Sequence, residues 1–102
     1  MLIMKPSCEN CDTDLPSESN EAMICSYECT FCADCVSDVL DNVCPNCGGG
    51  FNKRPTRPSF AWRDGVSTKH QPPSEERVLK PVDIQAHLKF AAEVKRVKPR
   101  KR

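Results

Sequence analysis

Residues 24–47 read ICSYECTFCADCVSDVLDNVCPNC, and this stretch decides the fold because six of the chain's eight cysteines lie in it. The other two cysteines stand upstream in the segment Cys8-Glu9-Asn10-Cys11. A Cys-x-x-Cys pair places two thiolates on one tight turn, close enough to hold one edge of a tetrahedral metal ion. Two pairs complete a four-thiolate shell, so eight cysteines predict two metal sites.

The cysteine pairs can be grouped sequentially or in alternation, and we favour alternation. The short run Cys29-x-x-Cys32-x-x-Cys35 favours it, and crossed loops would join the whole region into one compact unit. Site one then comprises Cys8, Cys11, Cys32 and Cys35, and site two comprises Cys25, Cys29, Cys44 and Cys47. We expect two Zn²⁺ ions, with iron in a rubredoxin-like site or a redox-active Cys-x-x-Cys pair as the alternatives.

The residues around the cysteines predict the local structure. Gly48 after Cys47, and Asp12 after Cys11, occupy positions where a left-handed backbone turns amides toward the sulfurs. Residues 23–31 are expected to form a β-hairpin, and residues 36–42 a short helix opened by Cys35. Apolar cover would come from the hairpin residues Ile24, Tyr27 and Phe31 and from the helix residues Val36, Val39 and Leu40.

The order and spacing of the pairs resemble the cross-braced RING finger in an all-cysteine version, and Cys44-Pro45-Asn46-Cys47 is similar to the closing Cys-Pro-x-Cys of that family. More closely, three segments resemble a small bacterial zinc-ligand-rich family, catalogued as domain of unknown function 1272, over about residues 1–58. These segments are Met4-Lys5-Pro6, Ile24 to Cys32, and Val43 to Gly49. This resemblance implies a fold and a metal but no activity.

RING-type ubiquitin ligases recruit their partner enzymes through side chains that this chain lacks. Asn10 stands where that family has an aliphatic residue, no tryptophan lies between Cys35 and Cys44, and Gly48 replaces the basic residue after the last cysteine. Ubiquitin-ligase activity is therefore disfavoured and ranks third among the functions considered. Closed thiolate shells have no open position for substrate, and no catalytic constellation is visible, so we expect no enzyme activity.

Composition supports a fold held by metal. Only six of 102 residues are aromatic, too few for a large hydrophobic core. We therefore predict a small metal-stabilised α+β fold in which a RING-like or treble-clef two-zinc module, a β-hairpin plus a short helix, spans residues 1–52. A Pro-rich, irregular basic connector follows over 53–81, and a basic tail over 82–102, with an amphipathic helix predicted at 83–97 and capped by Asp83.

Charge divides the chain into two unlike halves. Residues 1–50 contain one basic and nine acidic side chains, a balance of −8, whereas residues 51–102 contain fourteen basic and five acidic ones, a balance of +9. An acidic head disfavours nucleic-acid binding by the zinc module, because phosphate contacts need Lys and Arg. We expect the head to attract the segment that follows it, burying Phe60 and Trp62 against Tyr27, Phe31 or Val39.

These observations favour protein binding or a structural adaptor function, with a partner that the sequence does not identify. The candidate partner-binding residues are Phe60, Trp62, Arg54, Arg57 and Arg63. Nucleic-acid association through the basic tail is the alternative. His70 and His87 are expected on the surface, because eight cysteines already supply the ligands. We expect no small-molecule substrate.

No segment has the ~20 consecutive apolar residues of a membrane span, and no signal-peptide pattern is visible. The expected location is the cytoplasm, where closely spaced cysteines act as metal ligands rather than as disulfides.

Overall fold

A β-hairpin forms the centre of the fold and carries cysteines of both sites. In the computed structural model, which describes residues 1–102, strand β1 (Ala22–Ile24) pairs antiparallel with β2 (Thr30–Cys32). The predicted hairpin is confirmed, and Phe31 is fully buried. Tyr27 is not buried, because the turn that holds it points into solvent, and its side chain is 76% exposed. The prediction that Tyr27 covers the core is therefore wrong.

A third, very short strand completes the sheet. Strand β3 (Asn52–Lys53) pairs antiparallel with β1, so the strand order is β2-β1-β3. It places Phe51 edge-on against Phe31, with ring centroids 5.5 Å apart. Lys53, predicted in the connector, thus lies in a strand, which two residues are too few to reveal as periodicity in a sequence.

Helix α1 (Ala33–Asp38) follows β2 directly and is shorter and earlier than predicted. Its N-cap is Cys32, whose Sγ accepts a hydrogen bond from the backbone N–H of Cys35 at 3.4 Å. The chain leaves the helix before Asp41 and Asn42, which both have left-handed backbones, with φ of 54° and 56°. The predicted inward-facing residues are buried or half-buried: Val36, Leu40 and, less completely, Val39.

The hydrophobic core is small and is made largely of cysteine. Its central cluster has 11 buried residues, of which five are Cys8, Cys25, Cys32, Cys35 and Cys44. Thiol side chains supply little apolar area compared with leucine or phenylalanine, so burial by itself stabilises this core weakly.

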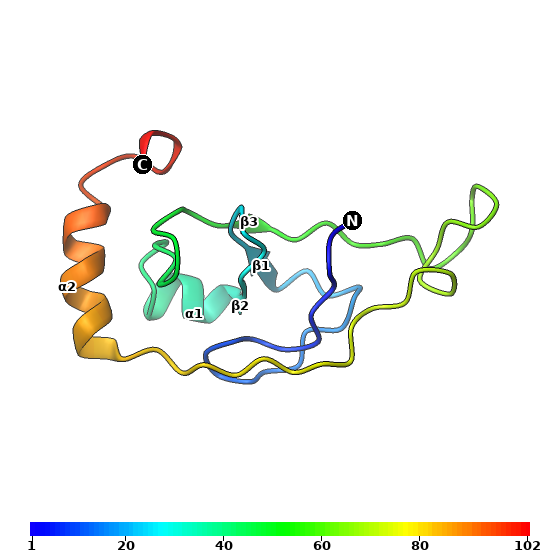
Figure 1. Cartoon of the computed structure of the whole chain (residues 1–102), viewed down its shortest axis with the longest axis horizontal. Helices are drawn as coiled ribbons and strands as arrows, with labels where there is room; N and C mark the ends of the chain where they lie inside the picture. Colours follow the sequence, from blue (N-terminus) through cyan, green and yellow to red (C-terminus); the bar gives the residue numbers. More distant parts are fainter.

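The second half of the chain first extends away from the module in a loop and then runs back along it to the second helix (Figure 1). As predicted, residues 59–81 form no helix or regular strand. Helix α2 (Ile84–Val94) lies at one end of the 47 Å long axis, and the loop at about residues 58–71 lies at the other (Figure 1). The predicted helix is confirmed over these bounds, and the Asp83 side chain caps it by accepting the Ala86 N–H at 3.1 Å. A 3-10 turn, η1 (Pro99–Lys101), follows.

Helix α2 docks on the module through a histidine that was predicted on the surface. His87 is buried, and its Nε2 lies 2.9 Å from the carbonyl oxygen of Leu40. Ala91 is also buried, whereas Ile84 and Leu88 are exposed, contrary to the expected apolar face. The hydrogen bond to Leu40 fixes which face of the helix packs on the module. The apolar pattern alone predicted a different face. None of the helices has the length and apolar character needed to cross a membrane.

Arg54 is a structural residue rather than the surface residue that the sequence suggested. It is only 3% exposed, and its guanidinium donates to three backbone carbonyl oxygens. The acceptors are Lys5 O at 2.7 Å, Leu15 O at 3.2 Å and Pro16 O at 3.0 Å. Burial lowers the pKa of Arg54 below its ordinary value. The side chain therefore ties the start of the connector to the N-terminal loop, and its role as a partner contact is withdrawn.

Replacing Arg54 with Ala is expected to destabilise the protein by about 3 kcal/mol, because buried carbonyl groups lose charged donors. Arg63→Ala is the matched control, since Arg63 is exposed, and it should change stability by less than about 0.5 kcal/mol. Thermal or denaturant unfolding of the metal-loaded variants measures both. Equal stability of the two variants would contradict the structural role of Arg54.

Candidate metal centre

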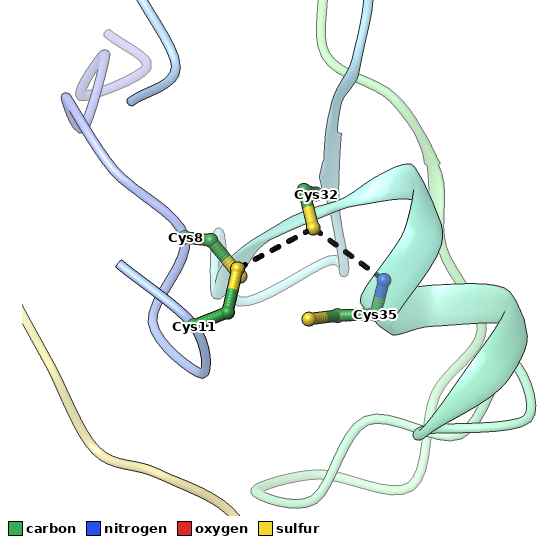
Figure 2. A group of neighbouring side chains, drawn as sticks. All are labelled: Cys8, Cys11, Cys32 and Cys35. Atoms are coloured by element: carbon green, nitrogen blue, oxygen red, sulfur yellow. Dashed lines mark hydrogen bonds between the residues drawn. The ribbon is translucent and has the colours of Figure 1, made fainter. Parts of the chain in front are cut away.

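Four cysteines from two distant segments converge at site one. Cys8 and Cys11 come from the N-terminal loop, and Cys32 and Cys35 come from the end of β2 and the first turn of α1 (Figure 2). Their sulfur atoms all lie within 4.8 Å of one another. This grouping pairs the first cysteine pair with Cys32 and Cys35, as alternation predicts, and not with the hairpin cysteines that follow it in sequence.

The sulfur geometry fits a tetrahedral ion. A metal–sulfur bond of about 2.3 Å places sulfur atoms about 3.8 Å apart at the edges of a tetrahedron. The Sγ atoms of Cys11 and Cys32 are 3.7 Å apart. An all-sulfur donor set selects a soft or borderline metal ion over Mg²⁺ or Ca²⁺. These four residues could therefore hold one metal ion.

The turn between Cys8 and Cys11 has the backbone that its sequence predicts. Asp12 has a φ of 65°, and its N–H donates to the carbonyl oxygen of Cys8 at 3.0 Å. Gly48 repeats this at the last pair, with a φ of 79° and an N–H bond to Cys44 O at 2.8 Å. Glycine is favoured at position 48 by this left-handed backbone and not by a lack of room, since a Cβ there would lie at an ordinary contact distance of 3.5 Å from Cζ of Phe90.

A second group brings together three of the four remaining cysteines. The sulfur atoms of Cys25, Cys44 and Cys47 lie within 4.8 Å of one another. Cys29 is outside this limit, but it stays beside the group, since the Asn46 side chain between Cys44 and Cys47 donates to its Sγ at 3.4 Å. The three clustered cysteines could hold a metal ion, and Cys29 is the adjacent candidate for a fourth ligand.

Burial raises the pKa of several cysteine thiols. The pKa of Cys29, Cys32, Cys35 and Cys44 lies above the ordinary thiol value, chiefly through burial. Burial also opposes ionisation at Cys11, but hydrogen bonds from the side chain and backbone of Thr13 lower its pKa to about 7. Without a metal, buried thiols therefore stay protonated. A bound cation must displace these protons, so metal binding becomes weaker as the pH falls.

The predicted partner-binding residues do not form one surface. Phe60 and Trp62 are 62% and 79% exposed and contact each other, with ring centroids 4.9 Å apart. The prediction that they are buried against the head is wrong. Arg63 is exposed beside them, whereas Arg57 is half-buried and bonds to backbone carbonyls. His70 is exposed, as predicted.

The acidic head does attract the basic half of the chain, at positions that the sequence did not single out. Arg77 pairs with Asp12 and Asp14, with N–O distances of 3.1 and 2.8 Å. Lys95 pairs with Asp41 at 2.7 Å, which lowers the pKa of that carboxyl group. These ion pairs hold the end of the connector and the C-terminal end of α2 against the module.

Two asparagines beside the cysteines were also not predicted as functional. Asn10 donates to Cys35 Sγ at 3.3 Å, and Asn46 donates to Cys29 Sγ. Each directly precedes the second cysteine of its pair, and this repeated Cys-x-Asn-Cys pattern is the signal that could have found them.

Two comparisons with known proteins find sequences similar to this chain. A family model described as "Protein of unknown function (DUF1272)" matches residues 1–57, which contain both cysteine groups. An uncharacterized protein of Rhizobium meliloti (strain 1021) is 51% identical over 81 residues, or 79% of this chain and 89% of that protein. No solved structure matches the chain. On the family match and this relative together, the chain belongs to the DUF1272 family.

Proposed function

We propose that this protein is a zinc-stabilised binding protein. Two four-thiolate zinc sites would hold a RING-like, cross-braced module, and the module would present a surface to another protein. The interleaving of the cysteine pairs supports the zinc sites, because each group joins segments that are separated in the chain. Native mass spectrometry tests this part, with two zinc ions per chain expected; one ion, none, or iron in their place would contradict it.

The zinc ions would stabilise the protein and not catalyse a reaction. Four thiolates complete the coordination of zinc and leave no position for water or substrate. The protein is thus proposed to have no enzyme activity. We also propose a cytoplasmic location, where closely spaced cysteines act as metal ligands rather than as disulfides.

The proposed protein-binding surface is the aromatic knob, which we define as residues 58–71. Its loop is closed by its own side chains: Gln71 accepts the Ser67 N–H at 3.2 Å and donates to Gly65 O at 2.9 Å. Ser67 is buried, and its hydroxyl lies 3.0 Å from Nδ1 of His70. Arg57 donates to Gln71 O at 2.7 Å at the base. The knob is therefore a preorganised loop at one end of the molecule (Figure 1).

This ordered loop exposes two large aromatic side chains where burial would be expected. The rings of Phe60 and Trp62 contact each other at a tilt of 58° but leave most of their surface in water. Aromatic residues on a preorganised loop bind with little loss of conformational entropy, and they are common among the residues that dominate protein interfaces. The exposed aromatic pair on an ordered loop therefore supports protein binding by the knob.

Replacing Trp62 with Ala is expected to weaken binding of the partner by on the order of 30-fold, the effect of losing a dominant interface residue. Affinity capture with the full-length protein identifies the partner, and titration of the purified partner measures the change. The single tryptophan also reports binding through its fluorescence in the unmodified protein.

Tyr27→Ala is the matched control for this substitution. Tyr27 is as exposed as Trp62 but lies at the hairpin turn, outside the knob. It should leave the affinity unchanged, and both variants should keep the stability of the original protein. A partner that binds Trp62→Ala as tightly as the original chain would contradict the proposed surface.

Nucleic-acid binding is the second candidate, supported by exposed cations at the C-terminal end. They are Arg96, Lys98, Arg100 and Lys101. Phosphate binding by such residues falls steeply with rising salt, roughly 0.9 log units in affinity per log unit of salt for each contact with duplex DNA. Electrophoretic mobility shifts at two salt concentrations distinguish it from binding by the knob, which should depend on salt only weakly.

A further inference from the structure

Two asparagines occupy equivalent positions in the two metal sites. Asn10 lies in Cys8-Glu9-Asn10-Cys11, and Asn46 lies in Cys44-Pro45-Asn46-Cys47. In each case the side-chain amide donates to a sulfur of the opposite cysteine pair: Asn10 to Cys35 at 3.3 Å, and Asn46 to Cys29 at 3.4 Å. Each amide therefore crosses its site and joins the two halves of the ligand set.

The two asparagines differ in what their amide oxygens accept. Oδ1 of Asn10 accepts the backbone N–H of Val82 at 2.8 Å, whereas no residue of the tail donates to Asn46. A backbone N–H can only donate, so the atom that faces Val82 must be the oxygen of the Asn10 amide. The NH₂ group is then directed at the sulfur of Cys35. Only at site one is the crossing amide held by the second half of the chain.

Val82 belongs to a strap, which we define as residues 77–82, that lies along the first cysteine turn (Figure 1). The backbone N–H of Lys80 donates to Glu9 O at 2.7 Å. Arg77 donates to Asp12 O at 2.7 Å and pairs with the side chains of Asp12 and Asp14. Asp12 is the left-handed residue that closes the turn. The strap thus contacts the turn through both of its ends, Arg77 and Val82, and through Lys80 in its middle.

We propose that Asn10 is a positioning residue that couples the strap to the Cys35 sulfur, so that the docked strap slows metal loss from site one but not from site two. The inference rests on the proposed metal binding. An amide donor satisfies a lone pair of a ligating sulfur and holds the ligand in place only if the amide itself is oriented. The Val82 N–H supplies that orientation at site one.

Two substitutions test separately the two hydrogen bonds of Asn10, the one from Val82 and the one to Cys35. Asn10→Asp keeps an oxygen for Val82 but replaces the donor that faces Cys35. Val82→Pro removes the backbone donor and leaves the Asn10 amide intact. Arg77→Ala loosens the strap without altering either group, which covers the case in which proline at position 82 disturbs packing. Asn46→Asp is the matched control, because it changes the equivalent donor at site two.

The experiment loads the full-length protein with ¹¹³Cd²⁺ and follows each site's resonance during a chase with EDTA. We expect Asn10→Asp to speed metal release from site one on the order of 10-fold, and Asn46→Asp to do the same at site two only. Val82→Pro and Arg77→Ala should speed release at site one alone. Combining Asn10→Asp with Val82→Pro should not speed release from site one further, since both substitutions break the same connection between Val82 and Cys35.

Three outcomes would overturn the inference in distinguishable ways. If Asn10→Asp leaves release from site one unchanged, the amide does not position Cys35. If Val82→Pro and Arg77→Ala change both sites equally, the strap stabilises the fold in general and not site one. A single cadmium resonance, or none, from the original protein would overturn the two-metal function itself, and the inference with it.

Discussion

Withdrawal of the metal ions by a strong chelator is expected to unfold residues 7–48. Five of the 11 residues in the central cluster are cysteines, so the apolar core that remains is too small to hold the segment. Structural zinc contributes on the order of 10 kcal/mol per site to folding, more than the net stability of about 3–5 kcal/mol that the core of so small a domain supplies. Far-ultraviolet circular dichroism and amide hydrogen exchange, recorded with reductant present, measure the loss.

The tail is expected to be released in the same transition. Helix α2 contacts Gly48 beside the last cysteine pair, and His87 bonds to Leu40 behind α1. Both contacts disappear when the module unfolds. Readdition of zinc should restore the signal, which separates metal loss from irreversible damage. Retention of the native spectrum with eight reduced, metal-free thiols would contradict the proposed role of the metal.

Cys32→Ser and Cys29→Ser are each expected to remove one metal ion, from different sites. Cys32 lies in the group of four with Cys8, and Cys29 lies beside the group of three with Cys44. A serine hydroxyl does not replace a thiolate as a zinc ligand, because it is not ionised at neutral pH. Native mass spectrometry should show one ion per chain for each variant, with a different cadmium resonance lost from each.

The two substitutions should differ in their cost to stability. Cys32 also caps α1, since its sulfur accepts the Cys35 N–H, and it is buried in the central cluster. Cys29 has no cap to lose and is only half-buried. Cys32→Ser is therefore expected to destabilise the protein more than Cys29→Ser. Loss of the same cadmium resonance from both variants would show that the two sulfurs bind one ion and would reject the alternating assignment.

Local chemistry in the sequence predicted the turns of the module well. The left-handed backbones at Asp12 and Gly48 follow from the residues that tolerate them, and the hairpin follows from the spacing between Cys25 and Cys32. The grouping of Cys8 and Cys11 with Cys32 and Cys35 could also be chosen from the spacing of the cysteine pairs. The turns depend on neighbours within a few residues, which a sequence displays directly, and the grouping depends on intervals that can be counted along the chain.

Contacts between distant segments were not predictable in the same way. Arg54 is an arginine in a basic segment, and only the folded chain places three carbonyl oxygens around its guanidinium. His87 similarly interrupts the apolar pattern of its helix, yet its bond to Leu40 decides which face docks. Phe60 and Trp62 were expected inside and lie outside, because the loop that carries them closes on its own polar side chains.

The sequence by itself thus determined that this protein has a cysteine-rich, metal-competent head and an oppositely charged tail, since ligand spacing and net charge are local properties of the chain. Only the tertiary structure decided where the second half of the chain lies and which residues of the head it contacts. The contacts of Arg77 with Asp12 and of Val82 with Asn10 join residues more than 60 positions apart. Hydrogen bonds and ion pairs of that kind depend on three-dimensional proximity, which neither composition nor periodicity records.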